Sequence, residues 1–491
     1  MTPTTIIIVG AGPVGLLLAI ELKLAGADIL VLERLIAPNP GIKAPSVGPL
    51  GAEALARRGM GAALEVAEAR AFAAMGPAGA AMRERLSRSR GHFALLPLRS
   101  DSEPERRMRW VDQQSLEAIL GARAAALGIE IRRGVDVTRL TRHEDHIELG
   151  WTAASGPAEA HCAWLVGCDG GRSTIRQLAG FAMSGTPPSL TLYQAIADLD
   201  HPERLPRGAT RMAGGVVING PRPRRLGLHD FSRPPADRDV PVTAEEVEAA
   251  LRRISGADVR VTRLEAAQRF SDVTRLVDDY CNGRVLLAGD AAHVHSPLGG
   301  QGLSLGLVDA ANLGWKLAAV ARGDKPQSLL DGYAAERRPV AEAVLANTLA
   351  QIALMRGDER SEALRAIVVE LMELDAVNAK LDGLISGLAT RYDLGSAENA
   401  VGRLIGDRPV GVAGAGTLFA AMADGDGVLL DASTDGRATG LAAGFKHLGS
   451  FPIEAGSSLL IRPDGCIAWA GRTDDIAGLK DALERWFTPV A

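Results

Sequence analysis

The stretch that decides the fold is TIIIVGAGPVGLLLAIELKLAGADILVLE, residues 5–33. Residues 5–9 form a β-branched apolar run typical of a buried strand, 12–26 have the apolar periodicity of a helix, and 28–32 form a second apolar run. Two strands joined by a helix over so short a span make a βαβ unit with parallel strands. The sequence therefore predicts an α/β protein built on a parallel sheet.

The glycine motif GAGPVG, residues 10–15, joins the first strand to the helix. In a GxGxxG motif the first glycine (Gly10) allows a tight turn, the second (Gly12) lets the backbone approach a pyrophosphate, and the third (Gly15) permits close packing. The phosphates then face the positive N-terminus of the helix that begins at Pro13 and Val14. This pattern predicts a Rossmann-like dinucleotide site.

Glu33 ends the second strand, 18 residues beyond Gly15. A carboxylate at this place accepts hydrogen bonds from a ribose and repels a 2′-phosphate. The motif therefore favours the adenosine of FAD or NAD over that of NADP.

A second motif, CDGGRSTIR at 168–176, follows the apolar run WLVG and opens another helix. Asp169 is a candidate cap for that helix. Arg172 and Arg176, four residues apart, are predicted to share one helix face, where they could meet an anionic cofactor or substrate.

The third motif is GDAAHVHSPLGGQGLSLGLVDAANLGWKL, residues 289–317. Asp290 ends the apolar run GRVLLAGD, at the sheet edge where ligands of open α/β sheets bind, and a carboxylate there suits a sugar-alcohol chain. Four residues after Asp290 carry little or no side chain and so leave room for a flat ring of a ligand. The helix that starts after them directs its N–H groups and positive dipole end at that ring. The four residues are Pro297, Gly299, Gly300 and Gly302.

Composition excludes several other classes of protein. The chain has 491 residues and a net charge of −5, which gives no basic surface for nucleic acid. Its N-terminal apolar stretch is broken by charged residues, glycines and a proline, so neither a signal peptide nor a membrane span is expected. Four cysteines without zinc or CxxC spacing favour a reducing cytoplasm. His293 and His295 lack a third ligand nearby, so no metal is predicted.

The rest of the chain divides by composition. Helical patterns occupy 51–68 and 113–127, and short strands run from 129 to 167. Residues 184–272 are rich in strands and prolines, with a helix near 243–254, and predict an antiparallel sheet. Long helices follow over most of 302–382. The last hundred residues predict a small α/β domain with strands at 427–431, 458–462 and 466–470 and a helix at 474–487.

With the three motifs in this order, the chain resembles the single-component (class A) flavoprotein monooxygenases of the p-hydroxybenzoate hydroxylase fold. YAAERRPVAEAVLANT (333–348), SGLATRYDLGS (386–396) and LLIRPDGCIAWAG (459–471) narrow the resemblance to aromatic polyketide hydroxylases, including angucycline and tetracycline tailoring enzymes and rifampicin-inactivating relatives. The resemblance implies a discontinuous FAD-binding domain (1–183 and 273–392), an inserted substrate-binding β-sheet domain (184–272) and a thioredoxin-like C-terminal domain (393–491). Because the last domain lacks CxxC, its implied role is structural.

The resemblance also implies roles for individual residues. Asp290 would bind the ribityl chain, and 297–302 would border the isoalloxazine. Further implied FAD contacts are Gly10, Gly12, Pro13, Val14, Gly15, Glu33, Arg34, Lys43, Gln113, Arg123 and Asp169. The chain has Lys43 where relatives often have Arg, and Ser304 where many have Asn, so the flavin contacts at these two positions are in question.

The implied reaction consumes a transiently bound NADPH, with NADH possible, and O₂. A flavin C4a-hydroperoxide would hydroxylate a polycyclic aromatic substrate, and Arg172 and Arg176 are the NAD(P)H candidates. Tyr193, Arg211 and His229 are candidate substrate contacts, and no catalytic base is identified. Baeyer–Villiger insertion, antibiotic inactivation and a non-catalytic flavin-binding role stay open, as does the choice between monomer and homodimer.

Overall fold

A six-stranded sheet organises the N-terminal part of the chain in the computed structural model, which describes residues 6–76, 78–87, 91–99, 103–235, 240–410, 416–431, 445–449, 457–472 and 474–487. The strands, in spatial order, are β17 (Cys281–Asn282), β18 (Val285–Leu287), β9 (Trp164–Gly167), β1 (Ile6–Val9), β2 (Ile29–Glu33) and β5 (Glu130–Arg133). All pairings except β17–β18 are parallel. The mixed α/β fold predicted from the first motif is confirmed.

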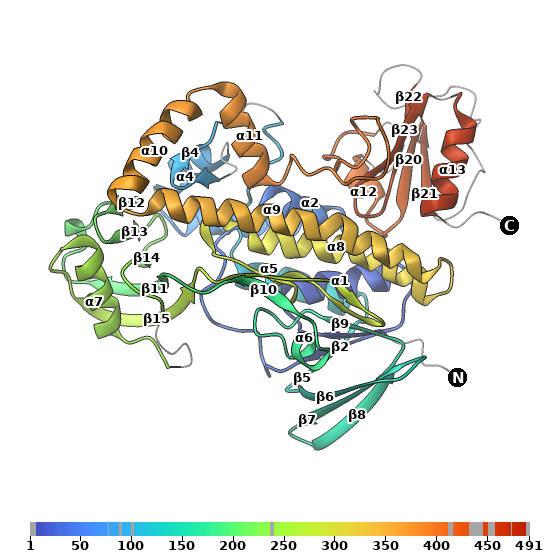
Figure 1. Cartoon of the computed structure of the whole chain (residues 1–491), viewed down its shortest axis with the longest axis horizontal. Helices are drawn as coiled ribbons and strands as arrows, with labels where there is room; N and C mark the ends of the chain where they lie inside the picture. Colours follow the sequence, from blue (N-terminus) through green and yellow to red (C-terminus); the bar gives the residue numbers. More distant parts are fainter. Residues whose placement is uncertain are drawn as a thin grey trace.

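Helix α1 (Pro13–Leu24) follows β1 and packs against α5 (Gln113–Ala126) and α8 (Gly302–Ala321) (Figure 1). The contact with α8 is close, because a Cβ on Gly314 would lie 2.3 Å from the Cβ of Glu21. Glycine at this position therefore lets two helices of different motifs approach each other. As a result, the starts of α1 and α8 lie on the same side of the sheet, at the carboxyl ends of its parallel strands.

The single helix predicted over 51–68 is wrong, because the structure has two: α2 (Pro49–Ala56) and α3 (Gly61–Ala73). Gly59 has φ +78° and turns the chain between them. The turn also carries Arg58 into the interior, where it pairs with Glu21 at 2.7 Å. The ion pair of Arg58 with Glu21 thus ends α2, although the helical pattern of the sequence continues to residue 68. Helix α4 (Ala78–Ser87) and the hairpin of β3 (His92–Phe93) and β4 (Leu96–Pro97) follow.

A five-stranded antiparallel sheet lies within residues 191–271 of the described chain. Its order is β12 (Gly208–Met212), β13 (Gly215–Asn219), β14 (Arg225–Asp230), β11 (Thr191–Leu199) and β15 (Val261–Ser271). One face packs against the amphipathic helix α7 (Ala244–Ser255). The other face shares an apolar cluster with Leu298 of the third motif.

Two three-stranded antiparallel sheets complete the same region of the described chain. One contains β6 (Asp136–Arg142), β7 (Ile147–Ala153) and β8 (Gly156–Cys162). The other contains β10 (Met183–Thr186), β16 (Thr274–Val277) and β19 (His293–Val294), and joins the two ends of the antiparallel segment to the third motif. A short helix, α6 (Thr174–Leu178), follows β9.

The long helix α9 (Asp331–Met355) runs across the molecule beside α8 (Figure 1). Helices α10 (Glu359–Met372) and α11 (Asp375–Ser386) follow it and lie together at one end. The C-terminal region has α12 (Leu418–Ala421), α13 (Ile476–Trp486) and a sheet ordered β21 (Phe445–Gly449), β20 (Gly427–Asp431), β22 (Ser457–Ile461), β23 (Ile467–Arg472). Strand β21 was not predicted. The likeness to thioredoxin stays a prediction. Within the described residues, no helix is both long and apolar enough to cross a membrane.

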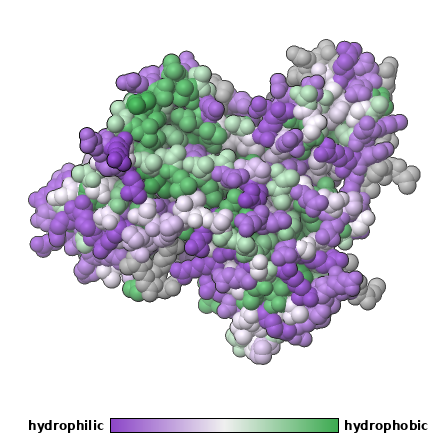
Figure 2. All heavy atoms as spheres, viewed as in Figure 1, coloured by the Kyte–Doolittle hydropathy of each residue, from purple (hydrophilic) through white to green (hydrophobic). Residues whose placement is uncertain are grey.

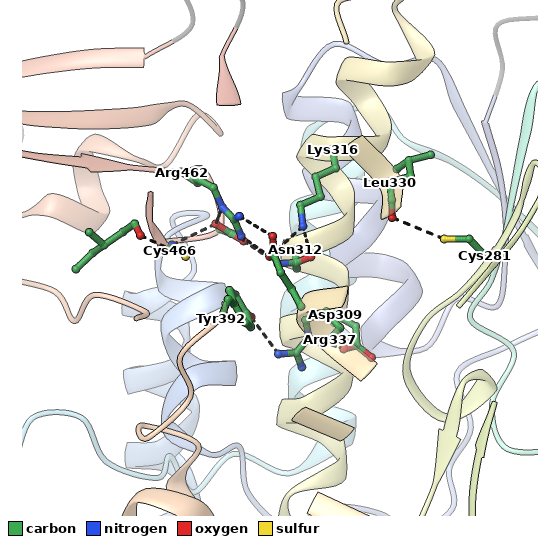
Figure 3. A network of polar contacts seen from close by, with 12 residues as sticks. Cys281, Asp309, Asn312, Lys316, Leu330, Arg337, Tyr392, Arg462 and Cys466 are labelled. Carbon is green, nitrogen blue, oxygen red and sulfur yellow. Dashed lines mark hydrogen bonds and ion pairs between the residues drawn. The ribbon is translucent and has the colours of Figure 1, made fainter. Parts of the chain in front are cut away.

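Buried charges join the C-terminal sheet to α8 and α9 (Figure 3). Arg462, with no exposed surface, pairs with Glu336 at 2.7 Å and with Asp464 at 2.6 Å. Lys316 pairs with the same Glu336 at 3.0 Å, and burial lowers its pKa to about 8. Because an uncompensated charge is costly to bury, these pairs tie three segments distant in sequence into one unit.

Candidate flavin and substrate site

The first glycine turn has the geometry that a pyrophosphate requires. Gly10 has φ +109°, and a Cβ there would lie 2.4 Å from the carbonyl oxygen of Cys168. A Cβ on Gly15 would lie 1.9 Å from the Gly10 oxygen, whereas one on Gly12 would meet nothing within 4 Å. Gly10 and Gly15 are therefore needed for packing, and Gly12 faces open space.

The start of α1 is free to bind an anion. Its N-cap, Gly12, makes no side-chain hydrogen bond, and Pro13 occupies the first turn. The unsatisfied N–H groups can donate hydrogen bonds to phosphate oxygens, and the positive end of the helix dipole favours their negative charge. Val14 has a different role, because its side chain packs where a Cβ on Gly289 or Gly306 would lie.

Glu33 stands at the end of β2, beside this turn. Its Oε2 accepts a hydrogen bond from the Ala11 N–H at 2.7 Å, and Oε1 accepts one from the Leu35 N–H at 2.8 Å. The carboxylate keeps lone pairs for ribose hydroxyls, because each oxygen can accept more than one hydrogen bond. Arg34 is exposed.

The DG motif lies against the same turn. Asp169 is half-buried, and its Oδ2 accepts a hydrogen bond from the Ile175 N–H at 3.1 Å. Its Oδ1 is buried without a hydrogen-bond partner among the described residues, and burial raises the pKa of this carboxyl. An unsatisfied buried oxygen next to Gly10 fits a hydroxyl donor of the cofactor.

The prediction that Arg172 and Arg176 share one helix face is wrong. Ser173 caps α6, with its hydroxyl accepting from the Arg176 N–H at 2.9 Å, so Arg172 lies in the turn before the helix. Arg176 is buried, and its guanidinium donates to the carbonyls of Ala291 (3.0 Å) and Gly171 (2.9 Å). It ties the DG motif to the third motif, which leaves the exposed Arg172 as the candidate for nicotinamide binding.

The third motif forms the loop between β18 and α8. Asp290 is exposed at the carboxyl end of β18, and Gly299 (φ +79°) and Gly300 (φ +66°) turn the chain after Pro297 into α8. Helix α8 begins at Gly302, and its N-cap Gln301 makes no side-chain cap hydrogen bond. A second helix start with free N–H groups thus faces the open side of the loop, as a ring carrying negative charge requires.

Asp309, one of the residues that sequence reasoning missed, holds this loop in place. Its Oδ2 lies 2.6 Å from His293 Nε2 and accepts the Gly289 N–H at 3.1 Å. Its Oδ1 accepts from Arg337 Nε at 2.7 Å, and Figure 3 shows these two side chains next to each other. Although burial by itself raises the pKa of Asp309, the charge of Arg337 and the contact with His293 bring it below its ordinary value. His293 is therefore a structural partner of a carboxylate.

A cavity adjoins the glycine bend and the starts of α2 and α8. Ser304 bridges the two helix starts, because its Oγ accepts the Gly48 N–H at 2.8 Å. Sequence reasoning questioned Ser304 as a flavin contact and missed its partner Gly48. The lining includes Gly48, Leu50, Met108, Gly299, Gly300, Gln301, Ser304, Leu305, Val308, Arg337, Val344 and Thr390. Within the described residues, no cluster of three or more His, Cys, Asp or Glu is arranged to hold a metal.

Three further residues were predicted to contact FAD, and the structure places them along or beside α5. Lys43 is half-buried, and its carbonyl accepts from Arg225 at 3.1 Å. The Gln113 N–H donates to the Ala44 carbonyl, so the start of α5 lies beside Lys43. Arg123 is ten residues further along α5, about 15 Å away, and its buried Nε has no partner in the described chain. Gln113 and Arg123 therefore cannot contact the same part of a cofactor.

Two of the three predicted substrate contacts are placed elsewhere by the structure. Tyr193 faces α7, where its hydroxyl donates to Glu246 at 3.0 Å. Arg211, on the edge strand β12, donates to the Met355 carbonyl at 3.0 Å and pairs with Glu362, which ties the sheet to α9 and α10. Both predictions are corrected, because each side chain is committed to packing outside the substrate face.

His229 lies on the opposite face of the antiparallel sheet. It stands opposite Leu192 and Val216, and Leu192 stands opposite Phe270, so these four share one face. Burial, and then the charge of His92, lower the pKa of His229 to about 3, so the ring is neutral at neutral pH. Its Nδ1 is buried without a partner among the described residues, and is free to bond a ligand hydroxyl.

Gln194, Arg225 and Gln268 give the same face a polar end, which sequence reasoning missed. The Arg225 guanidinium donates to Gln194 Oε1 at 3.2 Å, and Gln194 stands opposite Gln268. In the described chain Arg225 forms no ion pair, and burial followed by the charge of Arg222 lowers its pKa to about 10. The sequence TLYQAIADL of β11 could have predicted this polar end. Alternate residues of a strand point to opposite faces, so Gln194 and Tyr193 had to lie on different faces of the sheet.

The fold, the glycine turns at the starts of α1 and α8 and the adjoining sheet face together define a FAD-dependent monooxygenase. The comparisons with known proteins agree with this class. Residues 3–348 match the family described as FAD binding domain, and 398–489 match that described as Aromatic-ring hydroxylase, C-terminal. The chain belongs to this family of FAD-binding aromatic-ring hydroxylases. A non-catalytic flavin-binding role is therefore set aside.

Similar proteins include enzymes from Streptomyces species. The chain is 40% identical to 12-dehydrotetracycline 5-monooxygenase/anhydrotetracycline 6-monooxygenase of Streptomyces rimosus, over 99% of each chain. It is 36% identical to rifampicin monooxygenase of Streptomyces venezuelae, over 98% of each. The solved structure of anhydrotetracycline hydroxylase from S. rimosus superposes with a TM-score of 0.86 at 39% identity, over 99% of each chain. The predicted resemblance to aromatic polyketide hydroxylases is confirmed.

Proposed function

We propose that this enzyme hydroxylates a polycyclic aromatic, polyketide-like substrate bound between the glycine bend and the antiparallel sheet. The observation that carries the proposal is the shared apolar cluster of Leu298, next to the glycines, with Leu192 of β11. The same sheet face carries Phe270 and His229 at its apolar end and Arg225 at its polar end. The predicted division into domains 1–183 with 273–392, 184–272 and 393–491 is part of this proposal.

The proposed FAD site uses the residues whose geometry fits it. The turn of Gly10, Gly12 and Gly15 would hold the pyrophosphate, Glu33 the ribose, and Asp290 the ribityl chain. When bound, FAD supplies the electron transfer and oxygen chemistry that no side chain of the protein can perform. The hydroperoxide route, NADPH or NADH as transient reductant and O₂ as oxidant are parts of the proposal.

The protein's own residues bind and orient the substrate. Arg225 is a half-buried cation that forms no ion pair with a carboxylate of the described residues, so it favours an anionic oxygen such as a phenolate or enolate. Gln194 and Gln268 can bond neighbouring carbonyl or amide groups. The apolar end around Leu192 and Phe270 would exclude water and hold the aromatic rings, which positions the reacting carbon.

The proposed reaction is tested by reducing the purified enzyme with NADPH under argon and then admitting oxygen. We expect the yellow flavin spectrum to bleach, and a transient near-ultraviolet band to precede its return. Products from polycyclic phenols under ¹⁸O₂ should gain one labelled oxygen atom. The same label found as the inserted oxygen of a ring-expanded lactone, and not as a ring hydroxyl, would support Baeyer–Villiger insertion or drug inactivation, which the likeness to rifampicin monooxygenase keeps as the second candidate.

Replacing Arg225 tests the orientation of the substrate. A hydrogen bond to a charged group contributes about 1.5–3 kcal/mol, so Arg225→Leu should raise KM by roughly ten- to a hundredfold. Arg225→Lys should recover part of this loss, because it keeps the charge but not the planar fork. Flavin content should stay at the wild-type level in both variants.

Tyr193→Phe is the matched control, since Tyr193 is next to Gln194 but faces α7. It should lose about 0.5–1.5 kcal/mol of stability with the Glu246 hydrogen bond and leave KM unchanged. Equal KM values for Arg225→Leu and the wild type would contradict the assigned polar end.

A further inference from the structure

The hairpin of β3 and β4 adjoins the proposed substrate space, yet the proposed function gives it no role. Ala94, in the turn of the hairpin, belongs to the same apolar cluster as Leu192 of β11 and Leu298 of the third motif. Gln351 of α9 ties the hairpin to the glycine bend. Its Oε1 accepts the Ala94 N–H at 3.0 Å, and its Nε2 would lie 2.9 Å from a Cβ on Gly299. The hairpin is therefore a third wall of this space, beside the bend and the sheet.

Helices α10 and α11 pack over the hairpin. Met372 of α10 and Ile385 of α11 belong to the same apolar cluster, and α11 also contacts β3. Figure 2 shows apolar residues gathered over these two helices at the upper left. The hairpin thus lies in apolar surroundings, where a polar side chain without a partner calls for an explanation such as a ligand.

The turn of the hairpin holds two residues in a conformation that L side chains rarely adopt. Ala94 has φ +50° and Leu95 has φ +66°, although neither is glycine. The surroundings hold this turn in place, because Arg365 donates to the Ala94 carbonyl at 2.8 Å and His92 Nδ1 accepts the Leu95 N–H at 3.2 Å. Strained backbone that its surroundings hold in place is typical of segments that clamp a ligand. The shape of the hairpin therefore points to a role in binding.

The hydrogen bond from Leu95 also decides which nitrogen of His92 carries the proton. Because Nδ1 accepts, the neutral ring has its N–H at Nε2. Burial lowers the pKa of His92, so the ring is neutral at neutral pH. Among the described residues, no hydrogen bond uses this Nε2. His92 is therefore a donor without an acceptor.

His229 faces the hairpin from the antiparallel sheet. Its cross-strand neighbours Leu192 and Val216 belong to the same cluster as Ala94, and the charge of His92 contributes to the low pKa of His229. The two rings are therefore near each other. His229 is only 5% exposed, and its Nδ1 has no partner in the described part of the chain. One unpaired nitrogen on the hairpin and one on the sheet thus adjoin the same space.

Both rings are neutral at neutral pH, which decides the kind of group that they bind. An anionic oxygen would find no positive charge here, and an unpaired charge is costly to bury. A neutral hydroxyl or carbonyl oxygen can accept from His92 Nε2. His229 can then offer its lone pair to a hydroxyl, or its N–H to a carbonyl. The histidine pair is therefore suited to a neutral oxygen.

The opposite end of the same sheet face has the opposite preference. Arg225, which favours an anionic oxygen, lies four residues before His229 on β14, about 13 Å away at the rise of a β-strand. A single aromatic ring is too short to reach both ends. The two ends together therefore suit a fused ring system with a neutral oxygen at one end and an anionic oxygen at the other.

We propose that His92 is a specificity residue of the substrate site, which donates a hydrogen bond to a neutral hydroxyl or carbonyl oxygen held between the hairpin and His229. The histidine end and the Arg225 end then decide which way round a polycyclic substrate enters beside the glycine bend. This inference rests on the proposed function, because it takes the substrate to lie on this face of the sheet.

Two replacements of His92 separate the proposed contact from support of the strained turn. His92→Asn places an amide oxygen near the position of Nδ1, so it keeps an acceptor for the Leu95 N–H and removes the donor at Nε2. His92→Gln reaches the position of Nε2 with an amide donor and loses the acceptor at Nδ1. We therefore expect weaker substrate binding from the first variant, and a lower melting temperature with nearly normal binding from the second.

Binding is measured with emodin, a tricyclic phenol with hydroxyl groups on both outer rings, through the absorbance change of the flavin in the loaded enzyme. Loss of one neutral hydrogen bond should raise the Kd of His92→Asn by roughly three- to tenfold. The matched control is His201→Asn, because His201 is an exposed histidine that pairs with Glu203 at 3.0 Å. The control should bind emodin as the wild type does, and flavin content should be the same in all variants.

The outcomes separate this inference from the proposed function. Equal affinity of His92→Asn and the wild type would overturn the inference, and so would a loss of binding in His92→Gln alone, since only the shape of the turn would then matter. If such results came with labelled hydroxylated products, the proposed function would stand without the inference. If the affinities follow the expected order but no product gains labelled oxygen, the inference stands and the proposed hydroxylation fails.

Discussion

Asp290→Ala is expected to yield a folded protein that purifies without colour. Asp290 is exposed at the end of β18, so its removal should change the free energy of unfolding of the apoprotein by no more than about 0.5 kcal/mol. FAD loses the carboxylate that would bind its ribityl hydroxyls, and each such bond contributes about 1.5–3 kcal/mol. Affinity for FAD should therefore fall by roughly a hundredfold.

Flavin fluorescence during titration of the apoprotein measures this loss. The control is Asp136→Ala, which removes an exposed aspartate from β6, outside the predicted site. It should bind FAD as the wild type does. A yellow Asp290→Ala protein with unchanged affinity would show that another residue holds the ribityl chain.

Asp309→Ala is expected to have the largest effect on stability. It would leave Arg337, which is 1% exposed, as a buried cation without its carboxylate, and would also release Gly289 and His293. Removing one partner of a buried pair costs about 3–5 kcal/mol, a large part of the stability of a typical protein. Chemical denaturation should show this loss, together with weaker FAD binding, because the loop of Asp290 is anchored at Gly289.

The sign of the pH dependence follows from the pKa of Asp309. Because the folded state holds this pKa below its ordinary value, the contribution to stability is complete above about pH 4 and is lost as the pH falls through the folded value. The difference in melting temperature between the wild type and Asp309→Ala should therefore narrow in acid. A difference that widens below pH 4 would contradict the assignment, and Asp309→Asn, which keeps an acceptor for Gly289, should lie between the two.

Local patterns carried much of the fold and of the proposed cofactor site. Gly10, Gly12 and Gly15 could be assigned before any coordinates, because a tight turn and close packing impose the need for glycine within a few residues. Asp290 was predicted in the same way, as the polar residue that ends an apolar strand, and its contact with the cofactor stays a prediction. These inferences needed only distances along the chain.

The errors arose where a residue's partner is distant in sequence. Arg58 ends a helix by pairing with Glu21, and Arg176 turns inward to Ala291, although both have the local pattern of an exposed helix face. Local patterns assigned no role to His293, because only the fold brings Asp309 to it. Ser304 and Gly48 are 256 residues apart, yet they meet where two helices begin.

By itself the sequence determined the parallel sheet, the glycine turns, the family and the presence of an antiparallel sheet, because strand and helix periods and turn chemistry are short-range properties. Only the tertiary structure decided which face of β11 meets the glycine bend. A strand exposes alternate residues to two faces, and its own pattern does not say which face a distant segment will cover. Packing of Leu192 against Leu298 made that choice, which assigns Arg225 and His229 to the proposed substrate site and Tyr193 to the support behind it.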